Sequence, residues 1–188
     1  MRVITLLPAA TEIVAALGGG AYLVGISHEC DYPASLQRLP RVTATPVDIS
    51  APGAAIDVEV RRLRDAGQPV IGIDADQISR LAPDLIITQD LCDVCAVADG
   101  QVHRLSAVMA SPPRILSLGA RSLSEIWDDI QRVGKALDLE DDADELVVAL
   151  LSRLERIRQG PRTDARLLCI EWLEPLYLAG HWVPDLVD

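Results

Sequence analysis

The sequence predicts an α/β fold with an N-terminal doubly wound parallel sheet lobe, a long connecting helix and the start of a second α/β lobe. Three observations predict it. Short apolar strand patterns alternate with helical patterns from residue 2 to residue 137. One long helical pattern covers 140–160, and a new strand pattern begins at residue 165. We therefore expect three parts, namely residues 1–138, 139–160 and 161–188.

The first lobe begins with two strand patterns on either side of a helix. RVITLL (2–7) is an apolar strand ended by a proline, and AATEIVAALGGG (9–20) is a helix stopped by its glycines. YLVGIS (22–27) is the second strand and leads directly into the polar stretch SHECDYP (27–33). Residues 33–55 are rich in Pro, Ala, Thr and Ser and are expected to be irregular.

The alternation continues through the rest of the first lobe. The expected elements are helices over 56–67 and 75–81, a strand over 84–88, a helix over 99–109, a strand over 114–120 and a helix over 122–139. Such an order is typical of a parallel sheet, in which ligands bind outside the carboxyl ends of the strands. Two polar loops, 27–33 and 89–95, follow strands and are therefore predicted to lie at that edge.

The pattern at 140–160 is long enough to connect two lobes. Acidic residues crowd its start and arginines its end, which suits the dipole of a helix. ARLLCIEWL (165–173) is then read as the first strand of a second lobe. One strand and part of a helix cannot bury their own apolar faces, so this lobe is expected to be truncated.

Composition and charge exclude several function classes. The formal net charge of −11 argues against a nucleic-acid partner, which requires a clustered basic surface. No apolar run is long enough to insert into a membrane, and no secretory signal is visible. The sequence therefore predicts a cytoplasmic protein whose four cysteines are mostly reduced.

The two polar loops contain the residues best suited to ligand or metal chemistry. His28 and Cys30 lie in the first loop, and Cys92 and Cys95 form a CxxC in the second. A CxxC can be a redox pair, half of a tetrahedral zinc site or two packing residues. Since all four residues are predicted at one sheet edge, they are candidate ligands for a soft or borderline transition metal.

No combination of residues predicts an enzyme. The chain has no nucleophile elbow with a Ser-His-Asp order, no phosphate-binding loop and no HExxH motif. A binding protein without catalysis is the expectation, and no cofactor is required.

Several segments resemble one known family. RVITLLPAATEIVAALGGGAYLVGISHECDYP (2–33) resembles the start of substrate-binding proteins of ABC importers for cobalamin and ferric siderophores. LAPDLIIT (81–88) resembles the helix-to-strand junction of that family, and the helix at 140–160 resembles its rigid interlobe connector. A subgroup with HEC, CxxC and EWLEPLYLAGHWVP (171–184) is the most similar.

The resemblance implies a two-lobed protein that holds a small-molecule ligand between its lobes. Tyr32 matches the tyrosine that the cobalamin binders place against the ligand, and Asp76 matches an acidic residue that docks onto an ABC permease. His181 of the second lobe is implied to face the ligand or metal, while the tryptophans there either stack on a flat macrocycle or form core. The full set of predicted ligand contacts is His28, Cys30, Asp31, Tyr32, Gln89, Asp90, Cys92, Cys95, Glu171, Trp172, His181 and Trp182.

Three hypotheses of function follow. The first is a module that binds a corrinoid (cobalamin) or a ferric siderophore-type chelate, for ABC-type uptake or intracellular handling. The second is a cytoplasmic Cys/His metal-binding or thiol-redox protein. The third is a truncated product with no independent function, whose exposed apolar second lobe favours association.

Overall fold

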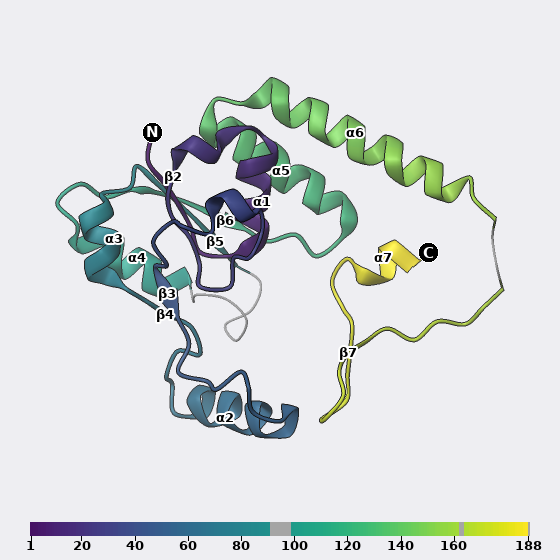
Figure 1. Cartoon of the computed structure of the whole chain (residues 1–188), viewed down its shortest axis with the longest axis horizontal. Helices are drawn as coiled ribbons and strands as arrows, with labels where there is room; N and C mark the ends of the chain where they lie inside the picture. The colour runs from purple at the N-terminus through teal and green to yellow at the C-terminus, as the bar shows by residue number, and fades with distance from the viewer. Residues whose placement is uncertain (91–98, 162–163, 188) are drawn as a thin grey trace. The chain divides into compact units, whose positions relative to one another are not determined.

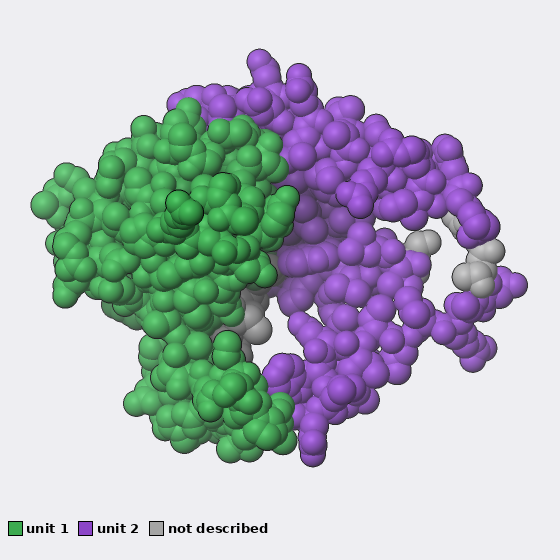
Figure 2. Space-filling view, in the orientation of Figure 1, with its two compact units in different colours: residues 1–119 green, residues 120–188 purple. Residues whose placement is uncertain are grey.

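The computed structural model describes residues 1–90, 99–161 and 164–187, and it confirms the predicted α/β fold (Figure 1). The chain forms two compact units, residues 1–119 and residues 120–188, which Figure 2 colours separately. Each unit is described by itself below. The division of the chain at residues 138 and 160 that the sequence suggests is not tested by these units and stays a prediction.

The first unit is built on a four-stranded sheet whose strands all run parallel. Its order is β2-β1-β5-β6, with β1 at Val3–Thr5, β2 at Leu23–Gly25, β5 at Leu85–Gln89 and β6 at Arg114–Leu118. Every residue of the central strand β1 is buried. Parallel neighbours require crossover connections, and helices supply them here, as the alternation of patterns predicts.

Four α-helices and two short 3₁₀ turns accompany this sheet. They are α1 (Pro8–Ala16), η1 (Gly19–Tyr22), η2 (Ala34–Leu36), α2 (Gly53–Asp65), α3 (Ala75–Leu81) and α4 (Asp99–Val108). Pro8 opens α1, where its missing N–H costs no hydrogen bond. The carboxylate of Asp74 caps α3 by accepting the N–H of Gln77 at 2.9 Å. The sequence therefore predicts these helices through local signals.

The core of the first unit joins the sheet to the helices. One cluster of buried residues within it consists of Ile4, Leu6, Val42, Ile71, Ile78, Ile86, Val102 and Leu105. Gly25 allows the layers to approach closely, because a Cβ there would lie 2.9 Å from Val42 Cγ1 and 3.0 Å from Leu81 Cδ1. Apolar burial of this kind is the main stabilising contribution to the unit.

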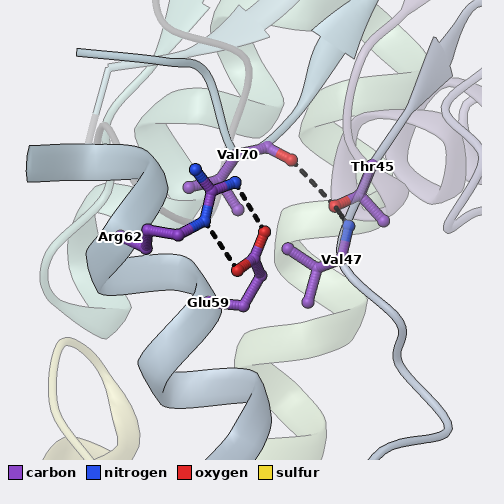
Figure 3. Close-up of polar contacts among 5 residues, drawn as sticks. All are labelled: Thr45, Val47, Glu59, Arg62 and Val70. Carbon is purple, nitrogen blue, oxygen red and sulfur yellow. Dashed lines mark hydrogen bonds and ion pairs between the residues drawn. The ribbon is translucent and has the colours of Figure 1, made fainter. Parts of the chain in front are cut away.

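A small pair of antiparallel strands begins in residues 33–55, which were expected to be irregular. Strand β3 (Thr43–Ala44) pairs with β4 (Gly72–Ile73), and α2 lies between them in the chain. The Thr45 hydroxyl donates to the Val70 carbonyl at 2.8 Å and accepts the Val47 N–H at 3.2 Å (Figure 3). A second apolar cluster forms here from Val47, Leu63 and Val70, with Ile56 and Val60 packed against it.

The second unit contains two long helices. These are α5 (Leu123–Leu137) and α6 (Glu140–Arg158), and they pack against each other. Ser122 caps α5 by accepting the Glu125 N–H at 3.3 Å. The turn between the helices is tight, because a Cβ on Gly134 would lie 2.5 Å from the Cβ of Ala143.

The end of the described chain is less regular than predicted. The strand expected over 165–173 is shorter in the structure, where β7 covers Ile170–Trp172 and pairs antiparallel with β8 (Tyr177–Leu178). Because β8 has two residues, it can pair with only the last part of the expected strand. Helix α7 (Val183–Val187) follows. Among the described residues, no helix has the length and apolarity needed to cross a bilayer.

Candidate functional site

The strand order of the first unit identifies one edge of its sheet as the place for a ligand. The chain runs from β1 to β2 on one side and later to β5 on the other side. The connections therefore change direction at the carboxyl end of β1, which is where open parallel sheets bind ligands. The stretch 27–33 follows β2, Gln89 ends β5 and Asp90 comes directly after it, so the described residues of the two predicted loops lie at this edge.

Arg41 holds the loop after β2 in place. A bridge between Ile26 and Arg41 brings its side chain alongside the loop. Nη1 then donates to the carbonyls of Ser27 at 2.8 Å and Cys30 at 2.5 Å, and Nη2 donates to that of Gln37 at 3.4 Å. One guanidinium thus satisfies three carbonyls that lie outside any strand or helix.

His28 is partly buried and anchored to β3. Its backbone N–H donates to the Thr43 hydroxyl at 2.9 Å, and its ring Nδ1 lies 2.7 Å from the same oxygen. Thr43 also shares a hydrogen bond of 3.1 Å with Ser27. Since these contacts fix the ring through Nδ1, a ligand or metal at His28 would meet Nε2.

Cys30 lies in a buried hydroxyl network. Its thiol shares a hydrogen bond of 3.0 Å with Thr11, whose hydroxyl is 2.6 Å from that of Thr5 on β1. Burial raises the pKa of the Cys30 thiol, and the bonds to Thr11 and Ser27 together with the charge of Arg41 offset part of this rise. The structure therefore places this thiol against Thr11, and its predicted role as a ligand or metal contact stays a prediction.

The other described residues of this edge are accessible. Asp31 is exposed, and the Tyr32 side chain is 65% exposed although it is a large aromatic group. Gln89 is partly buried at the end of β5, and the exposed Asp90 donates its N–H to the Leu118 carbonyl at 2.8 Å. These four residues lie on loops or strand ends at the edge where the sequence predicts them.

The predicted metal site is not tested. Cys92 and Cys95 lie outside the described residues. Within residues 1–90, 99–161 and 164–187, no three His, Cys, Asp or Glu side chains come close enough together to hold an ion. A transition metal bound by His28, Cys30, Cys92 and Cys95 therefore stays a prediction.

The second unit contains four predicted contacts. Glu171 is exposed on β7, while Trp172 is partly buried and donates its ring N–H to the Glu174 carbonyl at 2.9 Å. His181 is exposed and Trp182 partly buried, with ring centroids 5.7 Å apart. The two tryptophans are therefore neither fully buried core nor fully exposed, and their roles toward a ligand stay predictions.

Asp76, the predicted permease contact, lies in the first turn of α3. Its side chain is exposed, as a docking residue requires. An acidic residue at this position also stabilises the helix through its dipole, so the placement serves both roles. Docking stays a prediction.

The structure adds three residues that sequence reasoning missed. Thr11 lies near the start of α1 and bonds Cys30 and Thr5. Arg41 and Thr43 lie in a segment expected to be irregular, yet they hold the loop of His28. The contacts of Thr11 with Cys30, of Arg41 with Ser27 and of Thr43 with His28 join residues 14 to 19 positions apart, and no local pattern indicates them.

A family model described as periplasmic binding protein matches residues 3–183. The chain belongs to the periplasmic binding protein family. The resemblance stated from its sequence motifs is thereby confirmed. This family consists of substrate-binding proteins rather than enzymes, in agreement with the prediction of a binding protein.

Individual relatives are distant. The chain is 25% identical over 166 residues to the uncharacterized ABC transporter substrate-binding lipoprotein YvrC of Bacillus subtilis, covering 88% of this chain and 43% of the relative. The periplasmic vitamin B12 binding protein BtuF of Vibrio cholerae gives a TM-score of 0.64 at 22% identity, over 98% of this chain and 61% of that structure. The periplasmic heme binding protein HutB of the same species gives 0.64 at 17% identity, over 90% and 54%.

These similarities support the fold and correct one expectation. The chain spans about half the length of the relatives that it matches. The predicted cytoplasmic location is wrong, because the B. subtilis relative is a lipoprotein and the matched structures are periplasmic proteins. That expectation relied on the first residues of the sequence, which form β1 and α1 of the fold. The hypothesis of a cytoplasmic metal or thiol protein is likewise not supported.

Proposed function

We propose that this chain is part of an ABC-type substrate-binding protein whose ligand is a metal-containing macrocycle or chelate, with a corrinoid as the first candidate. Family membership supports the general role. Among the similar structures are a vitamin B12 binder and a heme binder, and both of those ligands are flat metal macrocycles. A ferric siderophore-type chelate is the second candidate within the same class.

The observation that carries the proposal is an exposed tyrosine on a fixed loop. Tyr32 leaves 65% of its side chain accessible to solvent. Two residues before it, the Cys30 carbonyl is bonded to the Arg41 guanidinium, and the Gln37 side chain donates to the Asp31 carbonyl. A rigid aromatic side chain loses little entropy on contact and offers a large apolar face, which suits a flat macrocycle.

Polar groups at the same edge of the sheet would provide specificity. The exposed carboxylates of Asp31 and Asp90 accept hydrogen bonds, and the Gln89 amide both donates and accepts. A corrinoid carries many amide groups on its rim, which match such partners. His28 Nε2 is the candidate for a polar or metal contact.

The first experiment is an absorption spectrum with elemental analysis of the protein purified without chelators. Cobalt or iron in stoichiometric amount, together with a chromophore band, supports the proposal and distinguishes its two ligand classes. Zinc without a chromophore would instead support the Cys and His metal site. Titrations of the metal-free protein with cyanocobalamin, hemin and ferric hydroxamate chelate follow, and binding of none of the three contradicts the proposal.

The same titrations should be repeated on two variants. Tyr32→Ala is expected to lower the affinity for the ligand by about tenfold or more, since the loss of a stacking contact costs roughly 1.5 kcal/mol. The matched control is Val108→Ala, because Val108 is 80% exposed and ends α4. Equal affinity of the two variants would contradict a role for Tyr32.

A further inference from the structure

A surface hollow of the first unit lies between the end of α2 and the first turns of α4. Its volume is about 380 Å³, and it is lined by Arg64, residues 67–70, Gln101 and Arg104. None of the predicted ligand contacts that the structure describes lines it. It is therefore a separate feature from the edge that contains Tyr32.

The charge of this hollow is opposite to that of the chain. The chain has 28 acidic and 17 basic residues, yet the described residues that line the hollow include two arginines and no carboxylate. The two glutamines supply further N–H donors. Such a lining is suited to an anion.

Arg64 is loosely held, unlike its neighbours on α2. Arg61 and Arg62 form ion pairs of 2.8 Å and 2.7 Å with Asp57 and Glu59, and Figure 3 shows the second pair. The contact of Arg64 with Asp65 is 3.9 Å long, and both of these side chains are more than half exposed. An exposed pair at this distance contributes little, so the Arg64 guanidinium retains donors for another partner.

Arg104 is in a position that its own helix disfavours. Its Nη1 lies 3.2 Å from where a Cβ of Gly100 would be, so the guanidinium folds back over the first turn of α4. The N-terminal end of a helix has positive partial charge and disfavours a cation. An anion in the hollow would relieve this repulsion and accept bonds from both arginines.

Gln101 fixes the two sides of the hollow relative to each other. Its Nε2 donates to the Ile71 carbonyl at 3.2 Å, which ties α4 to the segment that leads into β4. The two backbone segments that border the hollow are therefore held relative to each other before any ligand arrives, which lowers the entropic cost of binding.

We propose that this hollow binds an oxyanion, either a phosphate or a carboxylate group, between the guanidinium groups of Arg64 and Arg104. Guanidinium groups recognise both through paired N–H donors. The proposal is independent of the ligand edge, so its failure would leave the proposed function intact.

The test is a titration of the whole chain with inorganic phosphate and, separately, with citrate as the carboxylate probe, at constant ionic strength set by chloride. Amide chemical shifts of Gly67, Gln68, Gly100 and Gln101 are followed by NMR. Saturable shifts at these amides with either probe are expected, and the stronger probe identifies the chemical class.

Three variants decide whether the arginines are responsible. Arg64→Gln and Arg104→Gln should each weaken binding by about tenfold or more, because each removes a charge-assisted hydrogen bond. Arg61→Gln is the matched control on α2 and should bind like the parent chain. Arg104→Lys keeps the charge without the planar fork and should bind with intermediate affinity.

The opposite results overturn the proposal. They are shifts that stay linear in the probe concentration, shifts that Arg104→Gln leaves unchanged, or an equal loss in Arg61→Gln. If a glutamine variant should lose its fold by circular dichroism, the comparison of Arg104→Lys with the parent chain decides in its place.

Discussion

Arg41 stabilises the loop after β2 through hydrogen bonds to three backbone carbonyls. Its guanidinium reaches Ser27, Cys30 and Gln37 at distances of 2.5–3.4 Å. Replacing it by alanine removes the donor of the Cys30 and Gln37 carbonyls and leaves the Ser27 carbonyl with only the Cys30 N–H, and water can compensate only partly because Ser27 and Cys30 are buried. Arg41→Ala should therefore lower the free energy of unfolding by about 2 kcal/mol.

Urea unfolding followed by circular dichroism measures this change. Arg38→Ala is the control, since Arg38 is exposed and belongs to the same segment. It should change stability by less than about 0.5 kcal/mol. An Arg41→Ala protein as stable as the Arg38→Ala protein would show that the guanidinium does not hold the loop.

Cys30 makes stability depend on pH in a defined direction. Burial raises the pKa of its thiol above the ordinary 9.0, so the unfolded chain loses this proton at a lower pH than the folded chain does. The contribution of the thiol to stability is complete below that pH and is lost as the pH rises through the higher folded pKa. Between about pH 8 and pH 10, the parent chain should lose more stability than Cys30→Ser does.

The measurement is the midpoint of urea unfolding of both proteins across that range. Cys30→Ser keeps a hydroxyl near Thr11 without a group that titrates there, which makes it the matched control. Parallel curves for the two proteins would contradict the raised pKa of the thiol.

Single residues of the site were predictable from the sequence to different degrees. His28 and Tyr32 could be placed at the carboxyl edge of the sheet because they follow an apolar strand, and the loop after a strand of a parallel sheet lies at that edge. The contact of Cys30 with Thr11 crosses 19 positions of the chain, and that of Arg41 with Ser27 crosses 14. Such contacts depend on tertiary packing, which no spacing of residue types shows.

Elements were predictable where their periodicity is strong. Helices α5 and α6 and strands β5 and β6 appear within a few residues of their expected bounds. Strand β5 buries an apolar run and α5 buries one face, whereas α6 is recognisable from its helical spacing and charged ends although only Ala143 is buried. The pair β3 and β4 was missed because each strand has two residues, too few for any alternation to be visible. The strand expected at 165–173 was predicted too long. A strand needs a hydrogen-bonded neighbour along its length, and β8 pairs with only the last residues of this segment.

The junction of α5 and α6 allows a test of packing against helix propensity. In a helix, alanine is normally more stable than glycine by up to about 1 kcal/mol. At Gly134, however, the new Cβ would lie 2.5 Å from Ala143 Cβ and 3.0 Å from the Leu139 carbonyl oxygen. Neither atom can move without the backbone, so Gly134→Ala should destabilise the protein by about 1–3 kcal/mol.

Thermal unfolding of Gly134→Ala and of the double variant Gly134→Ala with Ala143→Gly measures this. The second substitution removes the nearest clashing atom. The double variant should therefore lose less stability than the sum of the losses of the two single variants. Additive effects would mean that the two side chains do not meet.

At the scale of the whole molecule, burial is unequal between the two units. The described residues of the first unit form apolar clusters around and beside its sheet. In the second unit, the described buried residues are Ala120, residues of α5 and Ala143 in the first turn of α6, while no residue described within 164–187 is buried. Several large apolar side chains of this last segment are exposed instead, among them Leu167, Leu173 and Leu178.

This inequality predicts how fast the backbone opens. A segment without buried side chains has little free energy opposing local unfolding, even where its amides are paired. Amide hydrogens of β7 and β8 should therefore exchange with deuterium at least about a hundredfold faster than those of β5, whose residues 85–88 are buried. Hydrogen exchange followed by mass spectrometry at neutral pH measures both segments in one sample. Exchange in 170–178 as slow as in 85–89 would mean that another surface covers this segment in solution, and Glu171, Trp172, His181 and Trp182 would then be fixed before a ligand binds.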